Sequence, residues 1–256
     1  MRQLLALLLL AGSLGPLRAQ ESAAAAAPPG AAAADASPGA AAAPSVEVAG
    51  MRDPEFKTYK DFIAGLDAFD AKRGLAPAAE LHFTIRAVDA SAGIDGVTMR
   101  IAGNETSIAV PIDAAGRFAI PRSQAALDEH AEIMLNRKKG GFRWRPDIHS
   151  PGVPAGSRRL GDLRLECEVR WAVEKREMPF FRRTLFGTMG VCSSKQIKVI
   201  QFAARPLAGY TLVDGARRVA NDSESASAGR VRYVAPLHDQ SWPDDTLVEL
   251  HYQNAQ

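Results

Sequence analysis

The chain has 256 residues, of which 46% are hydrophobic and 23% are charged. This length allows one large or two modest domains, and the composition argues against a collagen, a coiled coil or disorder over the full length. Lysine and arginine total 31 and aspartate and glutamate total 29, so the net charge is only +2. Because nucleic-acid binding requires a marked basic surface, no nucleic-acid partner is expected.

Residues 1–19 form a predicted secretory signal peptide. Arg2 supplies a positive charge, residues 4–10 are apolar, and a small residue stands at Ala19. A retained membrane anchor would need about 18 or more continuous apolar residues, and glycine, serine, proline and arginine interrupt this run. We expect cleavage after Ala19, no transmembrane segment in the mature chain, and a secreted, periplasmic or cell-surface location.

Residues 20–50 form a predicted disordered linker rich in alanine and proline. Residues 21–50 contain fifteen alanines and four prolines, and the prolines prevent the alanines from propagating a helix. Almost no side chain in the segment is large enough to join a core. The segment is expected to act as a tether, or simply as a spacer behind the cleavage site.

An amphipathic helix is predicted at 54–72. Asp53 is placed to cap it, Pro54 suits its first turn, and Gly74 ends the pattern. Large apolar residues recur at helical spacing: Phe56, Tyr59, Phe62, Ile63, Leu66 and Phe69. This stripe is expected to pack on its own domain, and the alternative is that it docks the chain into an envelope assembly. Its polar face mixes lysine with aspartate, which argues against adsorption to a membrane.

From Leu81 onward the hydrophobic period changes from helical spacing to alternation. Six short segments separated by turns are predicted as strands: 81–88, 97–101, 108–112, 117–120, 133–137 and 142–145. Consecutive strands without intervening helices favour antiparallel pairing. The fold class expected for residues 51–146 is therefore mainly β, an antiparallel β-sandwich preceded by one amphipathic helix.

Two of these segments carry a family resemblance. Gly96-Val97-Thr98-Met99-Arg100-Ile101 and Asp113-Ala114-Ala115-Gly116-Arg117-Phe118-Ala119-Ile120 resemble a strand and an Asp-x-x-Gly-x-Phe turn of the carboxypeptidase-regulatory-like, transthyretin-like β-sandwich. The resemblance covers residues 83–142. It implies a non-catalytic accessory domain of a secreted protein, although the Gly-Tyr pair expected near that family's last strand is absent.

Residues 147–256 are predicted to form a second mainly β region, behind a loop rich in proline and glycine at 146–156. Residues 163–173 alternate apolar with mostly charged side chains, which predicts a strand with one buried face. Further strands are predicted at 197–202, 210–213, 217–219, 231–234 and 246–252, with an exposed loop at 221–229. The two halves are expected to form one large sandwich or two tandem ones.

The chain has two cysteines, Cys167 and Cys192. In an exported protein this number indicates one disulfide. The competing hypothesis is a nucleophilic thiol. It is disfavoured because Cys167 lies on an apolar face and Cys192 has no histidine beside it in the sequence.

No catalytic or metal-binding motif stands out. The five histidines, His82, His130, His149, His238 and His251, form no zinc-ligand spacing, so a metal site would need ligands from distant strands. No glycine-rich phosphate loop or nucleophile elbow is present, and no cofactor is expected. Asp147 with His149, or His238 with Asp239, could orient an imidazole for general-base catalysis, so a hydrolase remains an alternative.

The most distinctive surface candidate is a predicted cationic hairpin. Its basic and aromatic residues are Arg137, Lys138, Lys139, Arg143, Trp144 and Arg145. Guanidinium groups can pair with carboxylates or phosphates, and an exposed tryptophan can stack on a sugar ring. The alternative is that the charged tip only keeps a strand edge from pairing with other chains. A second cluster, at residues 180–186, predicts a short amphipathic helix after Pro179, expected to cover a sheet edge.

Together these patterns predict a non-enzymatic binding or accessory module of the cell envelope, whose partner is an anionic envelope polymer or a protein. The oligomeric state is left open. The alternatives are a structural subunit that docks through the 54–72 helix and a hydrolase built on a His-Asp pair.

Overall fold

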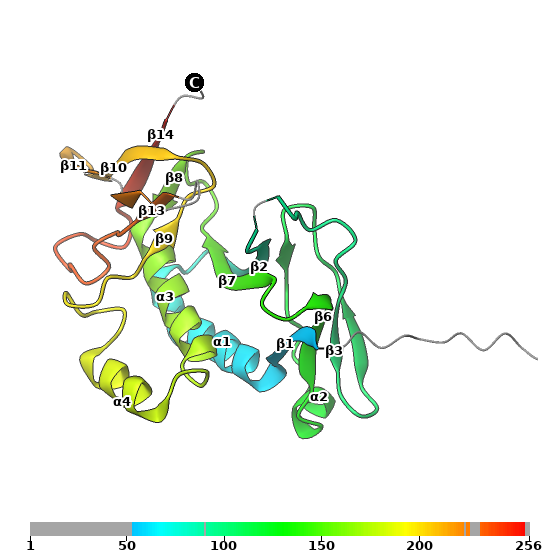
Figure 1. The fold of residues 1–256 in the computed structure, drawn as a ribbon. Helices are drawn as coiled ribbons and strands as arrows, with labels where there is room; N and C mark the ends of the chain where they lie inside the picture. The colour runs from blue at the N-terminus through cyan, green and yellow to red at the C-terminus, as the bar shows by residue number, and fades with distance from the viewer. Residues whose placement is uncertain (1–52, 90, 223, 226–230, 254–256) are drawn as a thin grey trace, which may run out of the picture. The chain divides into compact units, whose positions relative to one another are not determined.

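The computed structural model of the chain describes residues 53–89, 91–222, 224–225 and 231–253 (Figure 1). The predicted signal peptide at 1–19 and the linker at 20–50 lie outside these residues. Of the predicted loop at 221–229, residues 221–222 and 224–225 belong to strands, which corrects the prediction, and the others lie outside the described residues. The described residues all belong to one compact unit, Ala49–Gln256.

The first part of this unit holds two antiparallel sheets and three helical segments. The elements are β1 (Pro54–Thr58), α1 (Tyr59–Ala71), the 3-10 turn η1 (Arg73–Leu75), β2 (Glu80–Ala87), β3 (Met99–Ala102), β4 (Ser107–Val110), β5 (Arg117–Phe118), α2 (Gln124–Asp128), β6 (Glu132–Lys138) and β7 (Phe142–His149). One sheet has the order β1-β6-β3-β4 and the other the order β5-β2-β7.

The second part has two more antiparallel sheets and two helices. Its elements are β8 (Ser157–Arg159), α3 (Leu160–Glu174), α4 (Phe180–Met189), β9 (Gln201–Phe202), β10 (Leu207–Asp214), β11 (Arg217–Asp222), β12 (Glu224–Ser225), β13 (Val231–Tyr233) and β14 (Leu247–Tyr252). The sheet orders are β11-β10-β14-β8 and β12-β13-β9. Strand residues outnumber helical ones, so the prediction of a mainly β chain with antiparallel sheets is confirmed.

The predicted amphipathic helix exists, but it begins five residues late. Residues 54–58 form β1, which pairs with β6, and Thr58 occupies the N-cap position. Asp53 is not the cap, because its backbone has a positive φ of 57° and its carbonyl accepts a bond from the amide of Lys139. Pairing with β6 therefore outweighs the local preference of proline for a helix start.

The predicted hairpin at 133–145 is wrong, although both of its strands form. β6 pairs with β1 and β3, whereas β7 pairs with β2 along its length. The chain therefore passes from one sheet to the other at Lys138–Gly141. The turn at Asp113–Gly116 is as predicted. Asp113 accepts bonds from two backbone amides, and Gly116 has a φ of +81°.

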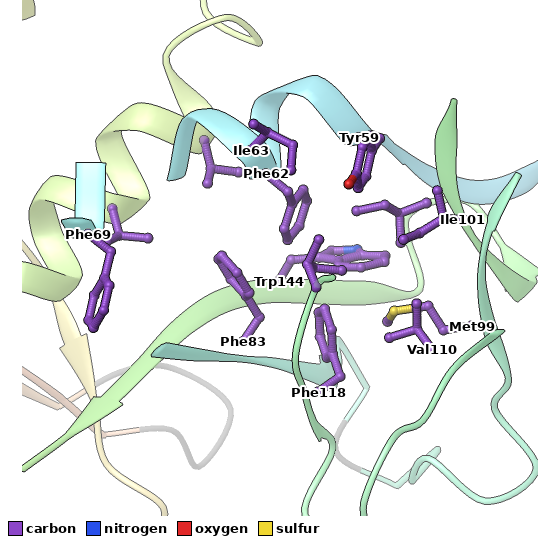
Figure 2. Close-up of a cluster of buried hydrophobic side chains, with 14 of the residues drawn as sticks. Tyr59, Phe62, Ile63, Phe69, Phe83, Met99, Ile101, Val110, Phe118 and Trp144 are labelled. Atoms are coloured by element: carbon purple, nitrogen blue, oxygen red, sulfur yellow. The ribbon is translucent and has the colours of Figure 1, made fainter. Parts of the chain in front are cut away.

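Both sheets of the first part and α1 enclose one hydrophobic cluster (Figure 2). Four aromatic rings lie at its centre: Phe62, Phe83, Phe118 and Trp144. The centroid of Phe62 is 4.8 Å from that of Phe83 and 5.7 Å from that of Trp144, distances at which aromatic pairs stabilise a core beyond their buried area. Phe62 is 1% exposed. The stripe on α1 thus packs on its own domain and offers no apolar docking face.

The largest correction concerns residues 163–173, which form helix α3 and not a strand. Leu160, Leu163 and Cys167 lie in a second hydrophobic cluster with the β10–β14 sheet. Leu165, Val169 and Val173 lie in the first cluster. Each set recurs every three or four residues, as on one face of a helix, and the two sets overlaid produce an apparent period of two. α3 is therefore shared by both cores.

Three charged residues in the N-terminal half of α3, Asp162, Arg164 and Glu166, are buried and paired. Asp162 accepts bonds from the amide and hydroxyl of Ser150 at 2.8 and 2.6 Å. Arg164 forms an ion pair with Asp244 and donates to three backbone carbonyls of the 237–242 segment. Burial of charge is tolerated here because each group has a partner.

Glu166 ties α3 to strand β7. It accepts the amide of Ile148 at 2.9 Å and Arg158 at 2.7 Å, and Arg158 also donates to the carbonyl of Ile148 at 2.9 Å. Burial raises the pKa of Glu166, while Arg158 and the Ile148 amide favour its charged form. The pair thereby satisfies both polar backbone groups of one residue at the free edge of β7.

The predicted disulfide between Cys167 and Cys192 is present. It links the middle of α3 to the segment that follows α4. No free cysteine occurs in the part of the chain that the structure describes.

Removing one member of the buried Arg158–Glu166 pair should destabilise the fold. We expect Arg158→Met to lower the free energy of unfolding by about 3–5 kcal/mol, because Glu166 would remain buried without a counter-ion. The double variant Arg158→Met/Glu166→Leu should recover much of that loss. Urea unfolding followed by circular dichroism measures both, and equal losses in the single and double variants would contradict the assigned coupling.

Opening the disulfide should also destabilise the chain. The bond closes a loop with a sequence separation of 25 residues, so Cys167→Ser/Cys192→Ser should lose about 3.5 kcal/mol in the chain-entropy model. Urea unfolding of the variant is compared with that of the oxidised wild type. Alkylation without reduction should label neither cysteine of the wild type, and labelling of either one in freshly purified protein would contradict the bond.

Candidate functional site

A cavity of about 250 Å³ lies where the free edge of β7 meets α3. β7 is an edge strand, since its partner within the sheet is β2. The lining combines aromatic and apolar side chains with six charged ones. The charged residues are Lys57, Arg143, Arg145, Arg170, Glu174 and Glu177. Four cations therefore face two carboxylates, and the cavity carries an excess of positive charge.

Arg145 is the central cation of this cavity. One of its terminal nitrogens donates to the carbonyl of Trp144 and to Glu174, each at 2.7 Å, while its buried Nε has no hydrogen-bond partner. Burial lowers the pKa of Arg145, and repulsion from Arg170 and Arg143 lowers it further, against the attraction of Glu174. An anion in the cavity would relieve this repulsion.

The rim of the cavity is organised by further ion pairs. Arg170 bonds to Glu174 within α3 at 3.0 Å, and Lys57 of β1 reaches Glu177 at 2.6 Å. Arg143 is exposed at the mouth. The two carboxylates are thus already engaged, and the guanidinium of Arg143 is the most accessible cation for a ligand.

The structure separates the six predicted binding residues into two groups. Arg143 and Arg145 line the cavity, together with part of Trp144. Arg137 and Lys138 end β6, Lys139 follows in the turn to β7, and none of the three lines the cavity.

Arg137 and Lys139 have other contacts. Arg137 donates to the carbonyl of Asp95 at 2.7 Å, and the ammonium of Lys139 lies 5.5 Å from the centre of the Phe56 ring. Lys138 is exposed. These interactions hold two of the three basic side chains against the protein.

The expectation of an exposed Trp144 for stacking on a sugar is wrong. Trp144 is 6% exposed, and its indole nitrogen donates to the buried Glu55 at 3.1 Å. Successive side chains of a strand point to opposite faces, so Trp144 enters the core while Arg143 and Arg145 do not.

Sequence reasoning missed four of the charged lining residues: Lys57, Arg170, Glu174 and Glu177. The sequence pattern predicts a helix at Lys57 and the solvent face of a strand at Arg170, and the structure differs at both positions. The helical spacing of Arg170 and Glu174, four residues apart, is the one local signal that could have joined them.

A second charged cluster lies near the other end of β7. Asp147 and His149 of β7 and Glu166 of α3 place three donor atoms within 4.8 Å of one another. Both carboxylates already pair with guanidinium groups, Asp147 with Arg117 and Glu166 with Arg158, each at 2.7 Å. A metal ion would have to displace these pairs, so the cluster is better explained as an ion-pair network.

The two His-Asp pairs of the hydrolase alternative differ in the structure. His149 lies 3.0 Å from Asp147, but the neighbouring Ser150 hydroxyl donates to Asp162. Asp239 bonds to the amide of Ser241 at 2.9 Å. His149 and Asp147 therefore have the geometry of a general base and the carboxylate that orients it. The neighbouring Ser150 hydroxyl, however, is bonded to Asp162 instead.

Among the described helices, none combines the length and apolarity that a membrane span requires. In comparisons with family models, with curated proteins and with solved structures, the chain matched none of them.

The stability that Asp147 contributes should depend on pH. Burial opposes its ionisation, but its bond to His149 and the charges of His149, Arg117 and Arg158 together lower its pKa below the ordinary value. A lowered folded-state pKa stabilises the fold above the unfolded-state pKa, and this stability is lost as the pH falls through the folded value.

We therefore expect Asp147→Asn to reduce the free energy of unfolding by about 1–3 kcal/mol at neutral pH. The difference from wild type should shrink below about pH 4, where aspartate protonates in the unfolded chain. Urea unfolding at a series of pH values measures it. A difference that is the same at pH 7 and in strong acid would contradict the electrostatic role.

Proposed function

We propose that this protein is a non-enzymatic binding module and that its cationic cavity binds carboxylate or phosphate groups of an anionic polymer. This proposal rests on the charges of the cavity lining, which has four cationic side chains and only two carboxylates. Three of these cations, Arg143, Arg145 and Arg170, line one cavity and repel one another. An anion placed among them would offset this repulsion, which supports the proposal.

We infer that the polymer belongs to the cell envelope. The N-terminal pattern of a leader, and the disulfide between Cys167 and Cys192, support an exported location, since such bonds persist in oxidising compartments. The resemblance of residues 83–142 to a carboxypeptidase-regulatory-like sandwich supports an accessory role. In this proposal the two sheets that share the first hydrophobic cluster form that sandwich.

The exposed mouth of the cavity suits a ligand that remains partly in solvent. Arg143 is accessible, while Arg145 and Arg170 are half-buried behind it. A forked guanidinium can bind a carboxylate or phosphate through two hydrogen bonds, so a repeating anionic polymer could place one group at the mouth and leave the rest outside. Lys138 and Lys139 would then add only general electrostatic attraction.

Co-sedimentation with insoluble peptidoglycan tests the proposal. We expect the mature protein to sediment with it, and Arg143→Glu to reduce the bound fraction about tenfold, the loss expected for one charge-assisted hydrogen-bonded pair. Peptidoglycan with amidated carboxylates, and peptidoglycan stripped of phosphate polymers, distinguish the two sources of anionic groups.

The matched control is Arg100→Glu, which makes the same change of charge at an exposed position of β3. It should sediment like the wild type. The variant Lys138→Glu/Lys139→Glu separates the turn from the cavity and should change binding much less than Arg143→Glu. Equal effects of Arg143→Glu and Arg100→Glu, or no sedimentation of the wild type, would reject the cavity as the binding site.

A further inference from the structure

Helix α4 exposes an unusually apolar surface. Phe180 and Phe181 are 73% and 74% exposed, and Leu185 is 44% exposed, whereas core residues of the same kinds are below 10%. The helix follows α3 and lies apart from the sheets in Figure 1. The prediction of a short amphipathic helix after Pro179 is confirmed, but these side chains do not cover a sheet edge.

The exposed side chains of α4 form one continuous face. At about 100° per residue, Thr184 and Thr188 fall between Phe180 and the pair Phe181 and Leu185. The hydroxyl groups of both threonines donate to carbonyls one turn earlier in the helix. Their polar atoms are thus occupied within the helix, and this face presents rings and methyl groups outward.

Arginines flank this face on both sides. Around the helix axis, Arg182 and Arg183 lie about 130° from the middle of this face, one on each side. The guanidinium of Arg183 also lies 5.4 Å from the centre of the Phe180 ring. From Lys175 to Lys198 the sequence has six basic residues and one acidic residue, Glu177. Before the helix, Glu177 pairs with Lys57 and Arg176 pairs with Asp61. The positive charge beside the apolar face therefore comes from Arg182 and Arg183 of α4, a helix that carries no acidic residue.

Helix α4 is connected to α3 at both of its ends, by the chain before it and by the disulfide after it. Its N-terminus is preceded by Pro179 and a short connection from α3. Its C-terminus ends at Gly190, which has a left-handed backbone with a φ of 70°, and Cys192 then joins the segment to Cys167 of α3. α4 is therefore a preformed helix whose outward face need not fold on binding.

We propose that α4 docks on an anionic lipid surface. Phe180, Phe181 and Leu185 enter the interface between headgroups and acyl chains, and Arg182 and Arg183 pair with lipid phosphates. Helices that lie in this interface combine an aromatic or aliphatic face with a basic polar face. The mixed charges of α1 argue against adsorption, and by the same criterion the charges of α4 favour it. With two arginines and no acidic residue, α4 has the charge complementarity that an anionic lipid surface requires.

Flotation of the mature protein with lipid vesicles tests the proposal. Vesicles of phosphatidylglycerol mixed with phosphatidylcholine should carry the protein upward, and vesicles of phosphatidylcholine alone should do so weakly. Phe180→Ser/Phe181→Ser should lower the partition coefficient about tenfold or more, because two large rings no longer leave water. Arg182→Glu should weaken binding to the anionic vesicles at least about fivefold.

The controls change the same kinds of residue elsewhere. Phe202→Ser replaces a phenylalanine that is 46% exposed on β9, and Arg100→Glu reverses an exposed charge on β3. Both should float like the wild type. Phe181→Trp adds a reporter whose fluorescence should shift to the blue on anionic vesicles.

Three results would overturn the proposal. The first is a wild type that does not float with the anionic vesicles or floats equally with phosphatidylcholine alone. The second is equal flotation of the wild type and the α4 variants. The third is a wild-type dimer by light scattering that Phe180→Ser/Phe181→Ser converts to monomer, because a second copy of the chain would then cover the helix.

Discussion

The burial of α3 between two hydrophobic cores is the constraint on which the rest of the described structure depends. Leu165 and Val169 pack on one core and Leu163 and Cys167 on the other, so few sides of the helix face water. Three buried charged residues of α3, Asp162, Arg164 and Glu166, are tolerated because each one has a partner on another segment of the chain. Removing those partners would leave buried charges without counter-ions, and α3 would no longer pack stably against both cores.

The same helix decides what the free edge of β7 can do. Glu166 and Arg158 occupy both backbone groups of Ile148, which blocks that part of the edge from pairing with another strand. Farther along β7, α3 contributes Arg170 and Glu174 to the cationic cavity. One end of the edge is thus closed by a structural ion pair, and the other end leaves positive charge accessible.

The two proposed surfaces rest on different physics. The cavity concentrates guanidinium groups where burial strengthens their interactions, and it favours an anion of defined geometry. α4 exposes aromatic rings beside arginines, and it favours a surface that offers both an apolar interior and negative charge. α1 shows the contrast, because its aromatic stripe is satisfied within its own core and Phe62 is not available to any partner.

Local patterns correctly predict most strands of the first part, though not β1, together with the turn at Asp113–Gly116, the amphipathic character of α1 and α4, and the pairing of the two cysteines. These features follow from periodicity, turn chemistry and cysteine number. Contacts between distant segments were needed to show that residues 160–174 are a helix, because two helix faces buried in two cores together produce an apparent strand pattern. The three-dimensional structure resolves this ambiguity. It also decided that Trp144 lies in the core while Arg143 lines a cavity with Arg170. Alternation shows that neighbouring side chains point apart, but which face meets a core depends on residues distant in sequence.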